Sequence, residues 1–85
     1  MNEKFHEVQL IRAEEEYLRL KIDGISYRIP WRLCSKRLEQ ASPAQRKIFE
    51  VSPSGYGIHW PEIDEDLAIT PLISQEGVFE VLKVK

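Results

Sequence analysis

The fold class is decided by the stretch Leu18-Arg19-Leu20-Lys21-Ile22-Asp23-Gly24-Ile25-Ser26-Tyr27-Arg28-Ile29. Apolar and polar residues alternate on both sides of Asp23-Gly24, which is the spacing of two half-buried strands. Asp-Gly favours a two-residue type I′ turn, because both central residues need positive φ and these two tolerate it. Such a turn places Leu18 opposite Ile29 and gathers the apolar side chains on one face. The sequence therefore predicts an antiparallel hairpin.

The same register places Arg19 directly opposite Arg28 on the polar face of the hairpin. Like charges at facing positions of a sheet repel each other. We expect a carboxylate to offset them, supplied by Glu7 on a third strand or by a partner protein.

A third strand is predicted upstream of the hairpin. Val8 and Leu10 alternate with polar residues, and Phe5 extends the apolar pattern toward the N-terminus. Residues 13–16 would connect this strand to Tyr17. The N-terminal part of the chain is therefore expected to form a three-strand antiparallel meander.

The period of the pattern changes after Pro30, which lacks the N–H that a sheet ladder needs and should end the third strand. Trp31, Cys34, Leu38 and Ala41 then recur at helical spacing. One helix is predicted across these positions. A cysteine at such a position is expected to be a small buried hydrophobe.

A second, short helix is predicted at Ser42-Pro43-Ala44-Gln45, with serine as N-cap, proline at the first helical position and glutamine three residues after the cap. Residues 48–51 are predicted to be strand-like, and residues 56–60 are predicted to form a strand that runs back after a turn. Residues 67–70 form either a short strand or the entry to a helical turn. The predicted fold class is α+β: a small antiparallel sheet with an N-terminal meander or hairpin, packed against one or two short helices.

Length and composition limit the classes of protein that fit. The 85 residues make a single domain over 1–85 with one modest core. The net charge is −2 with basic residues scattered among acidic ones, which predicts no direct binding to nucleic acid. No apolar run approaches the roughly 20 residues of a membrane span. The single cysteine and the lack of a signal-peptide pattern predict a cytoplasmic protein.

The chemically richest stretch is Ser54-Gly55-Tyr56-Gly57-Ile58-His59-Trp60-Pro61-Glu62-Ile63-Asp64-Glu65-Asp66-Leu67. Glu62, Asp64 and Asp66 alternate like the first ligands of a calcium loop, but the glycine and the final glutamate of that loop are missing. A dinucleotide-binding fingerprint would need a third glycine at Trp60. We therefore expect no metal and no cofactor, and interpret the acidic part as a solvated turn in which Asp64 caps the backbone N–H groups that follow.

Two residues of this stretch carry alternative interpretations. His59 is the best catalytic candidate, because imidazole titrates near neutral pH and carboxylates lie close in sequence, yet no nucleophile is recognisable beside it. Tyr56, Ile58 and Trp60 would share one face of a strand. Trp60 either closes the end of the core or remains exposed as an anchor for another protein.

Four features together resemble a known family: the Asp23-Gly24 hairpin, Ile29-Pro30-Trp31, Leu38-Glu39-Gln40-Ala41-Ser42-Pro43-Ala44-Gln45-Arg46, and the long string from Gly55 to Leu67. They resemble the bacterial domain-of-unknown-function family 2442, most closely over residues 18–73. Residues 32–36 and Pro71 depart from the pattern of the family. The resemblance implies a small α+β module with no established enzymatic activity. Some members of the family carry a helix-turn-helix domain, and others lie beside a small companion protein in a toxin–antitoxin-like arrangement.

The leading hypothesis is a non-catalytic protein-interaction module, the antitoxin-like partner of a small, basic companion protein, with self-association left open. Its expected partner-binding residues are Tyr56, His59, Trp60, Glu62, Asp64, Glu65 and Asp66. One alternative is a small enzyme that uses His59 with Asp64 or Asp66. A further alternative is an adaptor for a DNA-binding partner.

Overall fold

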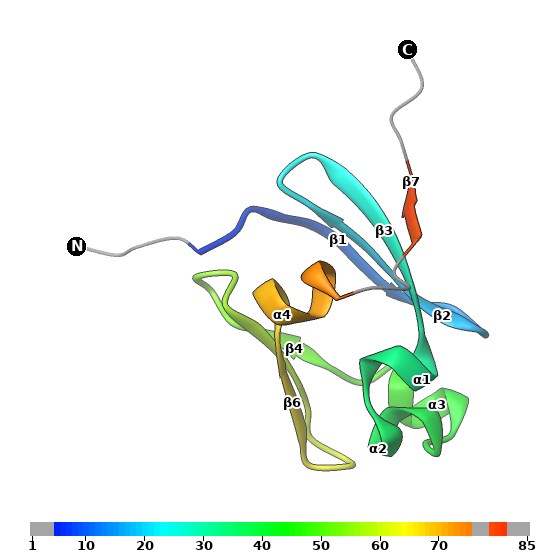
Figure 1. Ribbon diagram of the computed structural model, residues 1–85. Coiled ribbons are helices and arrows are strands. Elements are labelled where there is room, and N and C mark those ends of the chain that lie inside the picture. Colours follow the sequence, from blue (N-terminus) through cyan, green and yellow to red (C-terminus); the bar gives the residue numbers. More distant parts are fainter. Residues whose placement is uncertain (1–4, 76–78, 82–85) are drawn as a thin grey trace.

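A computed structural model describes residues 5–75 and 79–81 of the chain (Figure 1). The large sheet has the strand order β1-β2-β3-β7 and the small sheet has the order β4-β5-β6. The strands are β1 (Val8–Ala13), β2 (Tyr17–Ile22), β3 (Ile25–Pro30), β4 (Glu50–Val51), β5 (Gly57–Trp60), β6 (Glu65–Ala68) and β7 (Phe79–Val81). The helices are α1 (Trp31–Cys34), α2 (Lys36–Glu39), α3 (Pro43–Arg46) and α4 (Ile69–Ser74). The α+β class is confirmed, but the chain builds two antiparallel sheets where one was predicted.

The hairpin between β2 and β3 has the predicted register. Leu18 pairs with Ile29 and Arg19 with Arg28 across the two strands. Asp23 and Gly24 form the turn with φ of 52° and 84°, the left-handed region that the type I′ turn requires. β3 ends at Pro30, and α1 begins at the next residue, as expected.

The first strand differs from its prediction in register. Val8 pairs with Ile22, but the register shifts before Leu10, which pairs with Lys21. This bulge inserts one residue, so Leu10 lies on the polar face with Lys21, and the predicted alternation of Val8 and Leu10 is wrong. The pairing continues with Arg12 opposite Arg19, so the third strand contributes another cation at the position where a carboxylate was expected.

The helix predicted from Trp31 is interrupted. Ser35 has extended backbone angles (φ −174°, ψ 158°), which ends α1, and its Oγ accepts a hydrogen bond from the Leu38 N–H at 3.0 Å. Ser35 is therefore the N-cap of a separate helix, α2, because a capping serine competes with continued helix. The predicted buried residues Trp31, Cys34 and Leu38 are buried all the same. α3 has the full predicted capping box.

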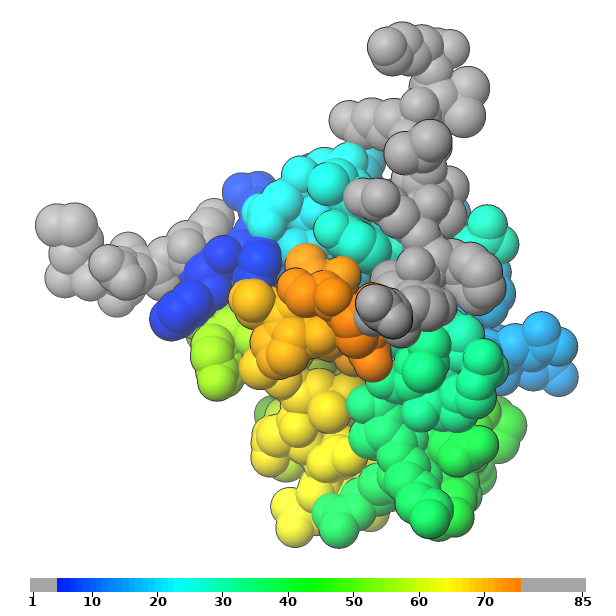
Figure 2. All heavy atoms as spheres, in the orientation of Figure 1, coloured from blue at the N-terminus to red at the C-terminus, as the bar shows by residue number. Residues whose placement is uncertain are grey.

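The core lies between the two sheets and is closed by the short helices. The buried apolar side chains form one cluster: Leu18, Leu20, Ile22, Ile29, Trp31, Cys34, Leu38, Ile58, Trp60, Ile69 and Leu72. In Figure 2, α4 (orange) lies between the hairpin of the large sheet, β6 and α1. Because both sheets bury their apolar faces in this cluster, their polar faces remain open to solvent. Within the described residues, no helix has the length and apolar character to cross a membrane.

Candidate functional site

The open face of the small sheet contains a hollow of about 630 Å³. Three of the predicted site residues line it, namely Tyr56, His59 and Asp66. The other lining residues are Glu50, Val51, Ser52, Pro53, Gly57, Ile58, Leu67 and Ala68. The hollow therefore combines apolar walls with two carboxylates, an imidazole and a phenol.

A row of three ionisable residues crosses the small sheet at this hollow. Glu50 pairs with His59 between β4 and β5, and His59 pairs with Asp66 between β5 and β6. His59 Nδ1 lies 2.7 Å from Asp66 Oδ1. Their side chains are 38% and 74% exposed, so the pair lies at the surface, where a contact of this kind contributes little to stability. Asp66 holds the imidazole in one orientation beside a second carboxylate.

Tyr56 lies at the rim of the hollow and is 55% exposed. Ser52 Oγ accepts hydrogen bonds from the N–H groups of Tyr56 and Gly57, at 2.9 and 3.0 Å, and thereby fixes the turn that presents the ring. The ring of Phe5 contacts Tyr56 edge to face, with the centroids 5.2 Å apart. The sequence pattern missed Phe5 as a neighbour of this site, because the contact joins residues far apart in the chain.

The remaining acidic residues do not line the hollow. Glu62 and Asp64 are exposed in the turn between β5 and β6. Asp64 has a φ of 54°, and its carbonyl accepts a hydrogen bond from Arg37 Nη1 at 2.7 Å. Glu65 is half-buried, and its Oε1 accepts the N–H of Asp66 at 3.2 Å. The structure therefore separates the predicted residues into a hollow and an acidic turn.

Trp60 belongs to the core. Its side chain has no exposed surface, and its Nε1 donates to the Arg46 carbonyl at 3.0 Å. Of its two alternative roles, the structure supports closing the core and contradicts an exposed anchor. Ile58 is buried beside it, whereas Tyr56 precedes β5 and does not share their buried face.

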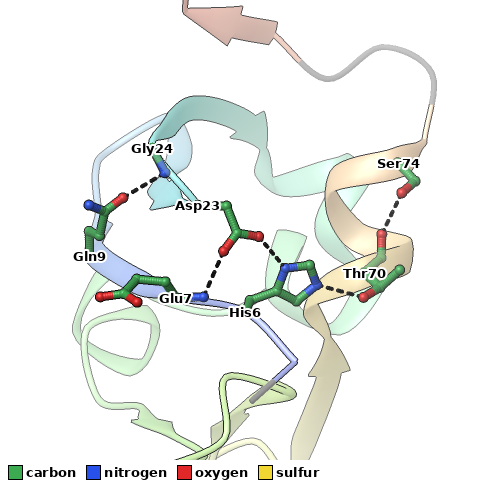
Figure 3. Close-up of polar contacts among 7 residues, drawn as sticks. All are labelled: His6, Glu7, Gln9, Asp23, Gly24, Thr70 and Ser74. Atoms are coloured by element: carbon green, nitrogen blue, oxygen red, sulfur yellow. Dashed lines mark hydrogen bonds and ion pairs between the residues drawn. The ribbon is translucent and has the colours of Figure 1, made fainter. Parts of the chain in front are cut away.

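A second polar cluster, centred on His6, was not anticipated from the sequence (Figure 3). His6 Nδ1 lies 2.7 Å from Asp23 Oδ2, and Nε2 lies 2.7 Å from Thr70 Oγ1. The other oxygen of Asp23 accepts the N–H of Glu7 at 2.8 Å. The imidazole thus joins the N-terminal segment, the turn of the hairpin and α4. No sequence signal marks His6, because its partners are brought to it by the tertiary fold.

The His6 cluster has the order carboxylate–imidazole–hydroxyl that also occurs in nucleophilic catalysis. The hydrogen bond from His6, followed by the one from the Glu7 N–H, holds the pKa of Asp23 below its usual value. However, the hollow of about 430 Å³ beside His6 is not lined by Thr70. We therefore interpret the cluster as a clamp between three segments. A Cβ at Gly55 would lie 2.2 Å from the His6 carbonyl oxygen, so the backbone of this segment packs closely against the small-sheet turn.

Comparison with known proteins places these features in a family. Residues 8–77 match the family model described as "Protein of unknown function (DUF2442)". The chain belongs to this family. The matched range contains the Asp23-Gly24 hairpin and every predicted site residue from Tyr56 to Asp66. The resemblance seen in the sequence is therefore confirmed. No curated protein matches the chain.

A solved structure of a protein of unknown function from Rhodospirillum rubrum ATCC 11170 is similar to this DUF2442 chain. The two share 28% sequence identity, with a TM-score of 0.71. The similarity covers 81% of this chain and 86% of the other. The two-sheet arrangement of this DUF2442 chain is therefore shared with a solved protein.

Proposed function

We propose that this DUF2442 chain is a non-catalytic protein-interaction module, and that the hollow on the small sheet receives a basic segment of a small companion protein. The observation that carries the proposal is the row Glu50–His59–Asp66, which borders the apolar wall of the hollow beside the exposed ring of Tyr56. An antitoxin-like role, in which the chain covers a surface of its companion, is the form of this function that the family resemblance suggests.

The chemistry of the hollow suits an arginine or lysine side chain. Residues at facing positions of neighbouring strands are about 5 Å apart, so Glu50 and Asp66, on either side of the β5 strand, are about 10 Å apart. A guanidinium placed between them can donate to carboxylate oxygens while its apolar stem lies against the wall of the hollow. Tyr56 adds a rigid aromatic contact of the type that is enriched at interface hot spots.

The acidic turn extends the same surface charge beyond the hollow. Glu62 and Asp64 are exposed, and within residues 5–75 no ion pair joins either of them to a lysine or arginine side chain. Such charges at the rim of an interface act mainly on the rate of association and on the choice of partner. We therefore assign the anchoring contacts to the hollow and the steering of a basic partner to the turn.

The experiment is a pull-down with the protein encoded by the adjacent gene, followed by titration of the purified pair. Tyr56→Ala and Asp66→Asn should each weaken binding by about tenfold or more. Glu39→Gln, which changes an exposed carboxylate on α2, is the matched control and should leave the affinity unchanged. Circular dichroism confirms that each variant is folded.

The proposal is wrong if the purified chain and its neighbour do not associate at low salt. It is also wrong if Glu39→Gln weakens the complex as much as the two variants in the hollow. Equal binding by all variants would mean that the companion uses another surface.

A small enzyme remains the second candidate, because Asp66 contacts His59 in the way that a carboxylate orients a general base. Asp64 lies in the turn and does not contribute to this pair. The enzyme hypothesis predicts that His59→Ala abolishes turnover while the companion is still bound. The adaptor hypothesis predicts that DNA retains the chain only when the companion is present.

A further inference from the structure

Three arginines lie side by side across the large sheet. Arg12 on β1 pairs with Arg19 on β2, and Arg19 pairs with Arg28 on β3. The three strands are adjacent in the large sheet (Figure 1). Facing residues are about 5 Å apart, so three positive charges occupy a strip of about 10 Å. The hairpin pattern predicted the pair of Arg19 and Arg28, and the pairing of β1 with β2 adds Arg12 to it.

The arginine row lies on the open face of the large sheet. All three arginines are exposed, whereas the residues that alternate with them on β2, Leu18 and Leu20, are buried in the core. Within residues 5–75, no ion pair joins any of the three to a carboxylate. Within this range, the repulsion of the row is therefore not offset by an ion pair.

An aromatic ring and another lysine extend this basic face. The guanidinium of Arg28 lies over the ring of Tyr17, 5.7 Å from its centroid. Lys21 lies on the same face as Arg19, two residues further along β2. The face thus offers four cations and one aromatic ring to a ligand.

The basic face continues over the edge of the large sheet. β1 is the edge strand in the observed order β1-β2-β3-β7. A hollow of about 410 Å³ lies along this edge, lined by two cations, one carboxylate and three apolar residues: Arg12, Lys47, Glu14, Ile11, Ala13 and Phe49. An edge strand presents backbone N–H and C=O groups that a further extended chain can pair with.

We propose that the arginine row and the adjoining β1 edge form a docking surface for an extended acidic segment of a partner protein. A carboxylate of that segment would lie opposite Arg12, with the charge of Arg19 one strand further in, and its backbone would run along β1. This surface faces away from the hollow of the small sheet, because both sheets turn their inner faces to the same core. It therefore serves a second segment or a second partner, independently of the function proposed above.

Charge at the margins of the face favours a short acidic polypeptide over a nucleic acid. Glu14, Glu15 and Glu16 follow β1 at one end of the strand, and Glu7 and Asp23 lie at the other. A long polyanion that ran along β1 would meet these carboxylates at both ends, and the net charge of −2 would oppose its approach. A segment with a few central carboxylates avoids the acidic residues at the two ends of β1, and its smaller charge is repelled less by the net charge of the chain.

The test uses a fluorescein-labelled eight-residue peptide in which glutamate and valine alternate over the four central positions and serine occupies the two positions at each end. We expect saturable binding that weakens as salt is raised, and an affinity at least fivefold lower for Arg19→Gln. Arg32→Gln on α1 is the matched control, because Arg32 is also exposed but lies outside the face. Arg19→Gln removes the central charge of a repelling row, so its unfolding midpoint should not fall.

Hydrogen exchange on the peptide complex tests the use of the edge. Amide exchange should slow in Val8–Ala13 on binding and stay unchanged in Gly57–Trp60. Equal affinities for Arg19→Gln and Arg32→Gln would overturn the proposal. So would tighter binding of an oligothymidylate of equal charge, which would indicate a nucleic acid. Self-association that Arg19→Gln abolishes would indicate a second copy as the occupant, and would overturn it too.

Discussion

The imidazole of His6 and the carboxylate of Asp23 are 17 residues apart in the chain and 2.7 Å apart in the structure. Asp23 is also a residue of the type I′ turn, with a φ of 52°. One side chain thus connects the turn of the hairpin with the N-terminal segment. Through Thr70, His6 extends the connection to α4. The hairpin is formed locally, and this contact ties its turn to two segments that lie far away in the chain.

Asp23→Asn should lower stability at neutral pH and change its dependence on acid. Asparagine keeps the turn, because it tolerates positive φ. The folded state lowers the pKa of Asp23 from its usual value of 3.8, so the contribution of the carboxylate is present above about pH 4 and is lost as the pH falls through the lowered pKa. The stability difference between wild type and variant should therefore shrink below pH 4. Urea titrations at several pH values measure it.

Asp64→Asn is the matched control for this prediction. Asp64 also has a positive φ, of 54°, and is exposed, but its hydrogen bond with Arg37 uses the backbone carbonyl. We expect little change in stability at any pH. A pH-independent loss in Asp23→Asn would show that the carboxylate charge does not matter to the clamp.

Gly55→Ala should be far more damaging than Gly24→Ala. Both glycines have positive φ, of 76° and 84°, which costs an alanine about 1–2 kcal/mol. A Cβ at Gly24 meets nothing within 4 Å, whereas one at Gly55 would lie 2.2 Å from the His6 carbonyl oxygen. The overlap forces the N-terminal segment away, for a total of about 3 kcal/mol or more. Equal midpoints of denaturation for the two variants would contradict this packing.

Trp60→Phe should destabilise the fold by about 1–3 kcal/mol, because the Arg46 carbonyl loses its donor and the smaller ring leaves a gap in the core. Chemical denaturation measures the loss. Partner binding by the folded fraction should be unchanged, since the side chain of Trp60 has no exposed surface. A variant of normal stability that loses its partner would restore the anchor role that the structure contradicts.

Cys34 should be unreactive in the folded protein. Its side chain is buried, and this burial raises the pKa of the thiol to about 12, so almost no thiolate exists at pH 8. Ellman's reagent should label Cys34 slowly in buffer and at once in guanidinium chloride. Fast labelling under native conditions would show that α1 opens readily.

Local pattern was sufficient to predict those parts of the fold in which the residues that decide the structure are neighbours in the chain. The Asp23-Gly24 hairpin and the capping box of α3 are of this kind, as is the end of β3 at Pro30. The helix from Trp31 failed as a prediction because the periodicity of its apolar residues continues across Ser35. A serine at that position can either continue the helix or cap a new one, and the local sequence allows both.

The residues of the candidate site likewise fall into those that the local sequence predicted and those that it did not. Tyr56, His59 and Asp66 were recognisable because they belong to one short stretch that returns on itself as β5 and β6. Glu50 and Phe5 were missed, since each reaches this surface from a different part of the chain.

The sequence alone determined the α+β class, the register of the hairpin and the family, because alternation, turn chemistry and motif strings can be recognised one segment at a time. Only the tertiary structure decided that Trp60 is buried, that His6 clamps three segments and that Arg12 joins the predicted pair of Arg19 and Arg28 in one row. The physical reason is that burial and charge density depend on which strands pair and which faces meet. Those pairings join residues whose separation along the chain carries no local signal.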